Sequence, residues 1–400
     1  MCMRILTFTN LYPSAVQPRH GIFIEQRVRH LLATGQVSVR VVAPAPWVPA
    51  PARTLLGRHG VLADLPAAEQ RNGVEIWRPR FFAVPKLTSW FNPVTMARSA
   101  LPAVRALQRQ QDFDLIDAHF VYPDGAAAVL LGSWLRKPVT VTARGTDINV
   151  FPRHLVPRAW IRRVLAQADA LITVSGALRD AMLALGADPR KVSVLRNGVD
   201  LAMFTPRADS VPDFHRPTLI SVGHLIPDKG QQFVIEALPQ LPGARLVLVG
   251  DGPAEQDLRR LAARLGVADR ITWTGTLGQA ELAERYAAAD VTVLASAREG
   301  MPNVLLESLA CGTPVIATNV GGSPEVVSTA AAGVLMRERS AAGVVEAFHR
   351  LAAQAPDRAG VRAHARQFGW SQTSEGLVRL FERVIRHQDG GARAARPASR

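Results

Sequence analysis

The stretch Arg298-Glu-Gly-Met-Pro-Asn-Val-Leu-Leu-Glu307-Ser-Leu-Ala-Cys-Gly-Thr-Pro-Val-Ile-Ala317 holds two glutamates, at positions 299 and 307. An apolar segment at Ala289–Ala295 precedes this stretch, and Pro314–Thr318 is apolar again. The pattern predicts a buried strand, a helix that begins near Pro302, and a second buried strand. Glu299 is then expected on the loop that leaves the first strand, and Glu307 about a turn and a half inside the helix.

These two carboxylates are placed where a ligand is expected. Open α/β sheets bind ligands at the carboxyl ends of their strands, and the N-terminus of a helix offers free amides that suit a phosphate. Two carboxylates beside such a site do not fit a bare anion. They fit a phosphate flanked by two hydroxyl-rich groups, a sugar and a ribose.

Composition indicates a globular chain of two domains. Its 400 residues are 48% hydrophobic and 20% charged, and no run of about 20 apolar residues is present to span a membrane. The first residues lack the apolar core of a signal peptide. The two cysteines, Cys2 and Cys311, give no disulfide framework. These features predict a cytoplasmic protein.

The charge balance is strongly basic, with 47 Lys and Arg against 33 Asp and Glu. This balance favours an anionic partner, which could be nucleic acid, anionic lipid or a phosphorylated substrate. The alternative is a GC-rich coding bias that places Arg where Lys might stand. Aromatic residues are only 6% and form no aromatic-rich basic strand, so no nucleic acid is expected as a partner.

Apolar strands alternate with amphipathic helices along almost the whole chain. Strands of a first series are predicted at Arg4–Thr9, Val37–Ala43, Asp114–Ala118, Pro138–Thr142, Ala170–Val174 and Val192–Leu195, with a helix at about Ile22–Thr34. Strands of a second series are predicted at Thr218–Gly223, Ala244–Val249, Ile271–Trp273, Val291–Ala295, Val315–Thr318 and Gly333–Met336. Two such series predict an α/β protein with two facing doubly wound domains.

The domain boundaries follow from the breaks between these series. The segment from Asp200 to Pro217 has three prolines and no clear period, so it is predicted to be the interdomain linker. The domains are therefore placed at residues 1–207 and 208–370. A last helix is predicted at 371–388, and the Gly-, Ala- and Arg-rich tail at 389–400 is predicted to be disordered.

Three further loops of the second series carry candidate ligand-binding residues at strand ends. Gly223-His-Leu-Ile-Pro-Asp-Lys-Gly230 supplies His224 and Lys229, and a lysine near a helix N-terminus suits a diphosphate. Gly250-Asp-Gly-Pro253 permits close backbone approach. The loop at 321–325 follows another strand on the same edge.

The first series also carries candidate ligand-binding residues, at strand ends and at the start of a helix. Gly21 at the start of a helix suits close approach of a ligand, and His119 directly follows a strand. The alternative for His119 is a histidine satisfied in the core. Arg144 and Asp147, in Arg144-Gly-Thr-Asp147, follow the next strand.

The sequence contains no clear metal or cofactor motif. Asp112-Phe-Asp114 has the form of a metal-binding triplet, but it precedes a strand and so lies at the wrong end of the sheet. No zinc spacing, dinucleotide-binding glycine pattern, Walker loop or serine nucleophile elbow is present. We therefore expect neither a metal nor a cofactor.

These motifs together resemble glycosyltransferase family 4, whose members have the GT-B fold. The resemblance rests on Glu299-x7-Glu307, Ala310–Ala317, the glycine loops at 223–230, 250–253 and 321–325, and Asn197-Gly-Val-Asp200, in that family's order. It implies two Rossmann-like domains, with the helix near 371–388 packing back on the N-terminal acceptor domain. It also implies a retaining, metal-independent transfer from a nucleotide sugar to a glycan or lipid-linked acceptor in polysaccharide biosynthesis.

The resemblance implies a role for each candidate residue. Glu307 would hold the ribose hydroxyls, Glu299 would face the donor sugar, and Lys229 would bind the diphosphate. His119 would lie beside the reacting sugar. The other donor-binding residues would be Gly21, His224, Gly250, Met301, Pro302, Asn303, Val304 and Leu305, with the amides of 303–305 near the sugar and phosphate. Arg144 and Asp147 would lie on the acceptor side.

Two departures from the family pattern concern charge. His224 stands where the family often has Arg, which predicts weaker or pH-sensitive phosphate binding. Arg144 stands where many members have His, and a fixed cation there favours an anionic acceptor.

Pro152–Ala166 suggests contact with a membrane. From Pro157 it is predicted to be helical, with an apolar stripe of Trp160, Ile161 and Leu165 flanked by Arg158, Arg162 and Arg163. We hypothesise peripheral binding to the anionic inner face of the membrane. The alternative is an ordinary helix whose stripe packs on the sheet.

Two other functions are compatible with these residues. One is a hydrolysing sugar-nucleotide epimerase of the same fold, which product analysis would separate from a transferase. The other is a basic membrane or nucleic-acid binder on an inactive scaffold. The intact Glu299, Glu307 and Lys229 argue against that second alternative.

Overall fold

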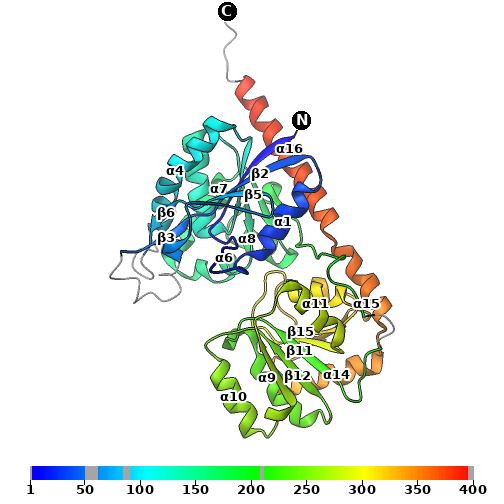
Figure 1. The fold of residues 1–400 in the computed structure, drawn as a ribbon. Coiled ribbons are helices and arrows are strands. Elements are labelled where there is room, and N and C mark those ends of the chain that lie inside the picture. The colour runs from blue at the N-terminus through cyan, green and yellow to red at the C-terminus, as the bar shows by residue number, and fades with distance from the viewer. Residues whose placement is uncertain (1, 50–61, 84–90, 208–210, 395–400) are drawn as a thin grey trace, which may run out of the picture. The chain divides into compact units, whose positions relative to one another are not determined.

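The computed structural model describes residues 2–49, 62–83, 91–207 and 211–394, and these form two compact α/β units (Figure 1). Unit 1 comprises residues 1–196 and 371–400, and unit 2 comprises residues 197–370. The division falls between Arg196 and Asn197, whereas the sequence placed the end of the first domain at residue 207. The chain therefore enters unit 2 before the proline-broken segment at 200–217, which lies wholly within the range of unit 2.

Unit 1 is built on an eight-stranded sheet with the order β10-β9-β8-β7-β1-β2-β5-β4. All neighbours are parallel except β4 and β5, which are antiparallel. Its strands are β1 (Met3–Phe8), β2 (Val37–Val42), β4 (Ala68–Arg71), β5 (Val74–Trp77), β7 (Leu115–His119), β8 (Val139–Ala143), β9 (Ala170–Thr173) and β10 (Val192–Val194). A separate two-stranded sheet pairs β3 (Ala45–Trp47) with β6 (Arg80–Phe82).

The six strands predicted for the first series are all present, with ends that differ by at most one residue. The hairpin β4–β5 was missed, although Asn72-Gly73 is the commonest signal for a two-residue turn. Both turn residues have positive φ, 49° for Asn72 and 77° for Gly73. The strand β4 has the polar sequence Ala-Glu-Gln-Arg, so no apolar run marks it.

Helices cover both faces of this sheet. On one face, α1 (Ile22–Leu32) and α16 (Trp370–Ala394) pack on apolar side chains of β1, β2 and β5. The links from β5 to β7, from β7 to β8 and from β8 to β9 run in the opposite direction along the sheet from the β1–β2 link. Right-handed crossovers then place their helices on the other face. These are α4 (Asn92–Gln110), α5 (Ala126–Leu135) and α7 (Leu155–Gln167), in contact in that order.

Short helices complete unit 1. They are α6 (Thr146–Asn149), α8 (Gly176–Ala184), a π-helical turn at Val121–Gly125 and 3₁₀ turns at Leu62–Asp64, Phe151–Arg153 and Pro189–Lys191. Residues 389–394, part of the tail that the sequence predicts to be disordered, continue α16. Ala392, Arg393 and Ala394 favour helix, and extending an existing helix needs no new nucleus, so Gly390 and Gly391 are tolerated. Residues 395–400 lie outside the described part of the chain.

Unit 2 has a wholly parallel six-stranded sheet with the order β13-β12-β11-β14-β15-β16. Its strands are β11 (Thr218–Val222), β12 (Arg245–Val249), β13 (Ile271–Gly275), β14 (Val291–Leu294), β15 (Val315–Thr318) and β16 (Gly333–Met336). They agree with the predicted strands because runs buried on both sides are apolar throughout. The order reverses between β11 and β14, which is the switch point where such sheets bind ligands.

The helices of unit 2 alternate with these strands. They are α9 (Gln231–Ala237), α10 (Glu255–Arg264), α11 (Gln279–Ala288), α12 (Asn303–Ala310), α13 (Ser323–Val326), α14 (Ala341–Gln354) and α15 (Arg358–Ala365). Turns of 3₁₀ helix occur at Pro227–Lys229, Leu238–Gln240, Ala268–Arg270 and Arg366–Phe368. The core of the unit gathers apolar side chains from the strands and from α9, α10 and α14.

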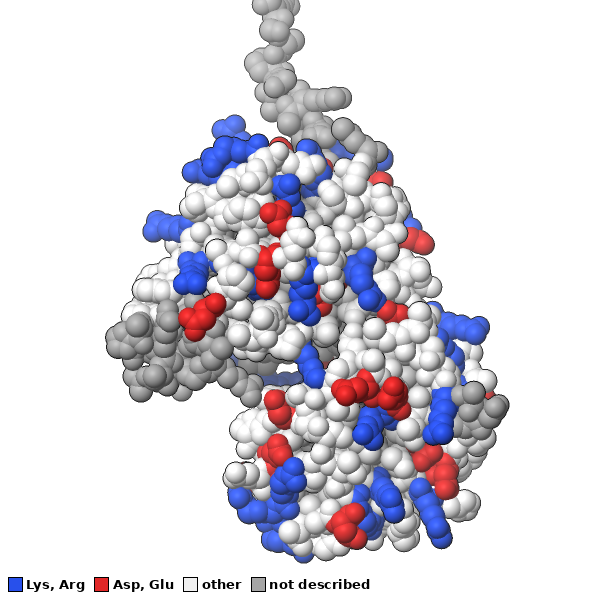
Figure 2. Space-filling view, in the orientation of Figure 1, with Lys and Arg blue, Asp and Glu red and all other residues white. Residues whose placement is uncertain are grey.

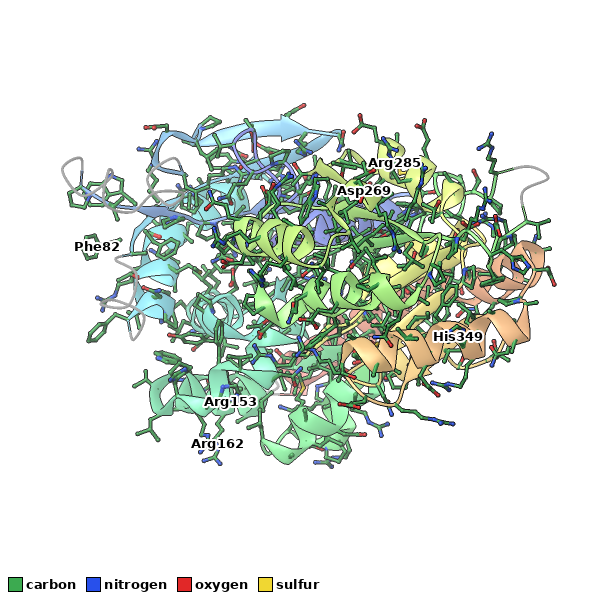
Figure 3. The ribbon with its side chains drawn as sticks, turned by 90° about the horizontal axis from the view of Figure 1, so that it is seen from below. Phe82, Arg153, Arg162, Asp269, Arg285 and His349 are labelled. Atoms are coloured by element: carbon green, nitrogen blue, oxygen red, sulfur yellow. The ribbon has the colours of Figure 1, made fainter. Side chains whose placement is uncertain are left out.

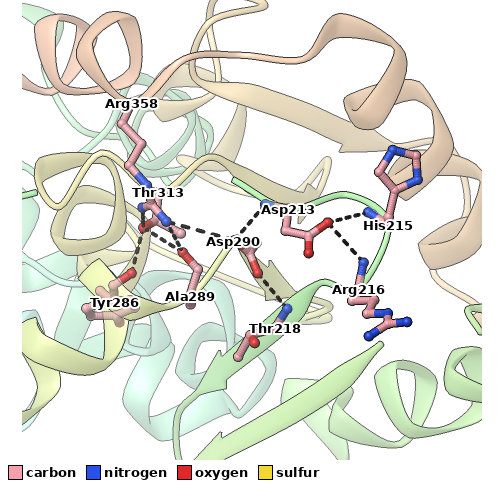
Figure 4. A network of polar contacts seen from close by, with 9 residues as sticks. All are labelled: Asp213, His215, Arg216, Thr218, Tyr286, Ala289, Asp290, Thr313 and Arg358. Carbon is pink, nitrogen blue, oxygen red and sulfur yellow. Dashed lines mark hydrogen bonds and ion pairs between the residues drawn. The ribbon is translucent and has the colours of Figure 1, made fainter. Parts of the chain in front are cut away.

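A polar network at the amino edge of this sheet fixes the segment that leads into it (Figure 4). The Asp290 carboxylate accepts hydrogen bonds from the backbone N–H groups of Asp213, at 2.9 Å, and Thr218, at 2.7 Å. On the other side, Arg358 of α15 donates to the Ala289 carbonyl at 2.8 Å and to the Thr313 hydroxyl at 2.9 Å. The end of the linker is thereby part of unit 2.

Candidate active site

Two candidate donor-binding residues meet at the switch point of unit 2. Lys229 follows β11 and Glu299 follows β14, and these strands are neighbours in the sheet. The Lys229 Nζ lies 2.7 Å from the Glu299 Oε1. Both side chains are partly accessible, with 29% of Lys229 and 11% of Glu299 exposed. The structure therefore brings together a cation and a carboxylate that are 70 residues apart in sequence.

Glycine and Arg339 hold the Lys229 loop in place. Gly230 has φ 73°, and a Cβ added there would lie 2.1 Å from the Ala295 carbonyl oxygen. Arg339 donates to that same carbonyl at 2.8 Å and to the Pro227 carbonyl at 3.0 Å. The loops after β11 and β14 are thus tied to one another through backbone groups, and this fixes the spacing between Lys229 and Glu299.

The Glu299 loop rests on the glycine loop after β15. Gly321 has φ 52°, and a Cβ there would lie 1.9 Å from the Glu299 carbonyl oxygen. The Gly322 N–H donates to the Gly300 carbonyl at 3.0 Å. The glycine at 321 is therefore explained by backbone packing against the loop that carries Glu299, and the N–H of residue 322 adds a hydrogen bond to the same loop.

The next helix, α12, begins at Asn303 with Pro302 as its N-cap. The Leu305 N–H donates to the Pro302 carbonyl at 3.1 Å, so this amide has an acceptor within the protein. In the described part of the chain, no acceptor is found for the amides of Asn303 and Val304. Those two amides, rather than all three predicted ones, are the candidates for a phosphate. Met301 and Pro302 are buried.

Glu307 lies inside α12 in an apolar setting. Burial raises the pKa of its carboxyl to about 7, although a hydrogen bond from Tyr286 opposes the shift. The Tyr286 hydroxyl lies 3.3 Å from the Glu307 Oε2. The neighbouring thiol of Cys311 has its pKa raised to about 12 by burial and by Glu307. The ionisation of Glu307 is therefore finely balanced at neutral pH.

His224 and Gly250 lie on the neighbouring loops after β11 and β12. The His224 ring is exposed, and its Nδ1 lies 2.6 Å from the Asp251 carbonyl oxygen. Gly250 has φ 134°, and a Cβ there would lie 2.0 Å from the Gly223 carbonyl oxygen. The structure thus gives Gly250 a backbone-packing role, and it leaves His224 available at the edge of the sheet.

In unit 1, His119 is fully buried at the end of β7. Its Nδ1 lies 2.7 Å from an Arg144 guanidinium nitrogen, and its Nε2 lies 3.3 Å from the Asp117 Oδ2. Burial lowers the pKa of His119 to about 3, against the opposing effect of Asp117. The imidazole is therefore neutral at physiological pH, with Nδ1 accepting from Arg144.

A buried ion pair between Arg27 and Asp117 contacts His119 through the Asp117 carboxylate. Arg27 of α1 lies 3.2 Å from the Asp117 carboxylate, and their side chains are 3% and 2% exposed. Burial alone would raise the pKa of Asp117, but Arg27 and His119 lower it to about 2. Arg27, Asp117, His119 and Arg144 thus form one chain of contacts. Sequence reasoning missed Arg27 and Asp117, although Arg27 is a charged residue on the apolar side of α1.

The loop after β8 holds Arg144 and Asp147 together. The Asp147 carboxylate accepts from the backbone N–H groups of Val121 and Gly145, both at 2.8 Å, and of Arg144 at 3.1 Å. The Arg144 guanidinium lies 4.9 Å from the centre of the Phe23 ring. Burial and the nearby Arg27 lower the pKa of Arg144 to about 9. Asp147 organises the loop, and Arg144 is the cation that the loop presents.

Two more features at the carboxyl ends of the unit 1 strands concern the loop after β1. Gly21 has φ 79°, and a Cβ there would lie 1.9 Å from the Leu11 carbonyl oxygen, so packing of the β1–α1 loop requires glycine. Asp124, which the sequence did not single out, is fully buried and accepts from the Asn10 N–H. Burial raises its pKa to about 8. Asp124 and Asp147 together tie the loops after β1, β7 and β8.

The Asp112-Phe-Asp114 triplet is engaged in ion pairs. Asp112 lies 2.7 Å from the Lys137 Nζ, and Asp114 lies 2.5 Å from Arg4. No group of three or more His, Cys, Asp or Glu side chains suited to a metal occurs among the residues that the structure describes.

The apolar stripe of α7 is not available to a membrane in the predicted form. Ile161 and Leu165 are buried, so the alternative of packing on the sheet is correct for these two residues. Trp160 is half-buried, with Arg163 5.6 Å from its ring centre. No helix in the described ranges is long and apolar enough to cross a membrane.

Comparison with known proteins agrees with this architecture. Residues 22–203 match the model described as Glycosyltransferase Family 4, and residues 206–368 match the model Glycosyl transferases group 1. The putative teichuronic acid biosynthesis glycosyltransferase TuaC of Bacillus subtilis is 32% identical over 362 residues, which cover 87% of this chain and 89% of TuaC. The D-inositol 3-phosphate glycosyltransferase of Stackebrandtia nassauensis is 33% identical over 323 residues, 72% of each chain.

Solved structures share the fold of this chain. The Anabaena protein HepE, crystallised in complex with UDP, is 20% identical, with a TM-score of 0.68 over 96% of this chain and 100% of its own. Two Rossmann-like units with this strand-end site define a glycosyltransferase of the GT-B type. The chain belongs to glycosyltransferase family 4.

Proposed function

We propose that this protein transfers a sugar from a nucleoside diphosphate sugar to a glycan or lipid-linked acceptor of cell-surface glycan synthesis. We further propose that the transfer retains the anomeric configuration and needs no metal ion. The observation that carries the proposal is the Lys229–Glu299 pair at the switch point of unit 2, with Glu307 in α12, the helix that follows the Glu299 loop. A cation, two carboxylates and a helix N-terminus match the diphosphate and the two hydroxyl-rich ends of such a donor.

Each of these groups would have one task. Lys229 and the amides of Asn303 and Val304 bind the diphosphate and stabilise the charge that develops as it leaves. Glu307 accepts hydrogen bonds from the ribose hydroxyls, and Glu299 accepts from the donor sugar. In the transfer, the bond from sugar C1 to the diphosphate oxygen breaks and the acceptor oxygen bonds to C1. The acceptor's hydroxyl proton leaves with the nucleoside diphosphate.

Unit 1 would supply the acceptor side. Because His119 is fully buried and neutral, we propose that it acts through Arg144, as a positioning residue. Arg144 is held by His119 and by Phe23, which favours an acceptor that carries a phosphate or carboxylate. Inositol 3-phosphate and teichuronic acid, in the names of two relatives, are such anions. A lipid-linked acceptor would place the reaction at the cytoplasmic face of an anionic membrane.

A donor panel tests the proposal. Purified protein is titrated calorimetrically with UDP-, GDP- and ADP-sugars, and the best donor is then incubated with matched acceptors that differ only in a phosphate or carboxylate. We expect release of nucleoside diphosphate, a new glycoside with the donor's anomeric configuration, and undiminished turnover in EDTA. Loss of turnover in EDTA with recovery in magnesium would refute metal independence. An epimerised sugar in place of a glycoside would indicate the epimerase.

A further inference from the structure

One face of unit 1 is covered by three neighbouring helices without a single acidic residue. The sequences of α4, α5 and α7 contain no Asp or Glu, while α4 and α7 together contribute Arg98, Arg105, Arg109, Arg158, Arg162 and Arg163. All six arginines are exposed. On the face drawn in Figure 2, the surface over α4 shows blue side chains without red ones. We call the exposed surface of α4, α5 and α7 the basic layer.

The arginines of the basic layer are aligned along their helices. Arg98, Arg105 and Arg109 follow the spacing i, i+7, i+11, which puts them on one side of α4. Arg158 and Arg162 are four residues apart and share one side of α7. Arg162 points away from the ribbon in Figure 3. The nearest acids on connecting loops are already engaged: Asp112 pairs with Lys137 at 2.7 Å, and Asp169 accepts from the Val139 N–H at 2.8 Å.

The opposite face of the same sheet has a different charge pattern. There the arginines of α16 stand beside carboxylates, with Arg379 near Glu375 and Arg386 near Glu382, each four residues apart. Glu25 of α1 pairs with Arg71. Coding bias towards arginine would act on both faces alike. The next helix on the face of the basic layer, α8, carries Asp180, which pairs with Arg179 at 3.0 Å, so the lack of acids is confined to α4, α5 and α7. A stretch of three neighbouring helices without acids points to an anionic partner of these helices rather than to composition.

Exposed apolar side chains on the same helices identify the class of partner. Leu155 at the start of α7 is 82% exposed, Phe91 beside α4 is 66% exposed, and Trp134 at the end of α5 is 40% exposed. A lipid surface accepts both kinds of group, because headgroups pair with arginine and the interface takes up aromatic and leucine side chains. A nucleic acid backbone would pair with the arginines but offers nothing to an exposed leucine.

We propose that the basic layer is a docking surface for an anionic lipid bilayer. This inference rests on the proposed function in one respect: membrane docking would hold the enzyme beside a lipid-linked acceptor. It replaces the predicted stripe of Trp160, Ile161 and Leu165 with a broader surface centred on α4 and the exposed side of α7. The binding itself needs neither donor nor acceptor.

The test is sedimentation with vesicles of phosphatidylcholine alone and of phosphatidylcholine mixed with phosphatidylglycerol. Wild-type protein should bind the anionic vesicles only, and less at high salt. The variant Arg98→Glu/Arg105→Glu/Arg109→Glu should bind about 100-fold more weakly, because three basic residues contribute about 1 kcal/mol each near an anionic surface. Leu155→Asp should weaken binding independently.

A matched control lies on the opposite face. Arg379→Glu/Arg383→Glu/Arg386→Glu in α16 makes the same change in net charge and should retain most of the binding. Equal losses in both triple variants, or wild-type binding to duplex DNA but not to anionic vesicles, would overturn the proposal. Calorimetric donor binding should be the same in wild type and both variants. Absent donor binding in all three would count against the proposed function and leave the vesicle result standing.

Discussion

Lys229 and Glu299 form an ion pair of 2.7 Å across the switch point of the unit 2 sheet. In the proposed function the two charges bind adjacent parts of a nucleotide sugar, since the cation suits the diphosphate and the carboxylate suits the hydroxyls of the transferred sugar. Lys229→Met should therefore lower donor affinity by roughly 10–150-fold, the value of one charged hydrogen bond of about 1.5–3 kcal/mol. Titration calorimetry measures the affinity. Unchanged affinity in a folded variant would remove Lys229 from the site.

Glu307 should make donor binding depend on pH. The folded-state pKa of its carboxyl is raised to about 7, so the group is largely protonated at pH 6 and ionised at pH 8. An ionised carboxyl accepts two ribose hydrogen bonds better than a protonated one. Donor affinity is therefore expected to rise between pH 6 and pH 8 in the wild type and to stay flat for Glu307→Gln. A pH profile common to both proteins would show that another group is responsible.

The same group has the opposite effect on folding stability. Its pKa is higher in the folded state than the ordinary value of 4.5 for a glutamate carboxyl, so the folded state binds more protons between these two values. Glu307 therefore contributes stability at low pH, and this contribution is lost as pH rises through about 7. Urea unfolding at pH 5 and pH 8 should show a smaller difference for Glu307→Gln than for wild type. An identical difference in both would contradict the raised pKa.

Gly321 should be required for donor binding as well as for the left-handed turn in which it lies. An alanine Cβ would lie 1.9 Å from the Glu299 carbonyl oxygen, so Gly321→Ala displaces the Glu299 loop. Gly266 is a matched control, because it has φ 66° and nothing within 4 Å of its added Cβ. Both variants should lose roughly 1–2 kcal/mol of stability from the left-handed conformation. Only Gly321→Ala should also lose donor affinity, and equal affinities in the two variants would contradict this account.

Arg27 and Asp117 should be strongly coupled in stability. Removing one partner of a buried ion pair leaves an uncompensated charge and costs about 3–5 kcal/mol. Arg27→Met and Asp117→Leu should each destabilise by that order, while the double variant should cost less than the sum. Denaturant unfolding of the four proteins gives the coupling energy. Additive losses would mean that the pair, 3.2 Å apart, does not act as a unit.

Much of this architecture was accessible from sequence because strands buried on both faces are apolar runs and their connecting helices are amphipathic. The candidate donor site was predictable for the same reason, since Lys229, Gly250, Glu299 and Gly321 all follow such strands. The family resemblance supplied the roles assigned to them. The roles themselves await the experiments described above.

What escaped prediction depends on long-range contacts. Periodicity gives no sign that Arg27 of α1 meets Asp117 of β7, 90 residues later, or that Asp124 loses its water on folding. It also does not reveal that the Leu305 amide already has an acceptor in Pro302. The burial of His119 and of the α7 stripe is likewise decided by neighbours elsewhere in the chain.

The discontinuity of unit 1 has a consequence for the protein's synthesis. Leu377, Val378, Leu380 and Phe381 of α16 complete the apolar layer on one face of its sheet, yet they follow the whole of unit 2 in the sequence. Unit 2 is continuous in sequence, so it has its whole chain before unit 1 does. On the ribosome, therefore, the part of unit 1 that precedes Asn197 has an uncovered apolar face until α16 has been made, and in this interval the chain most needs a chaperone.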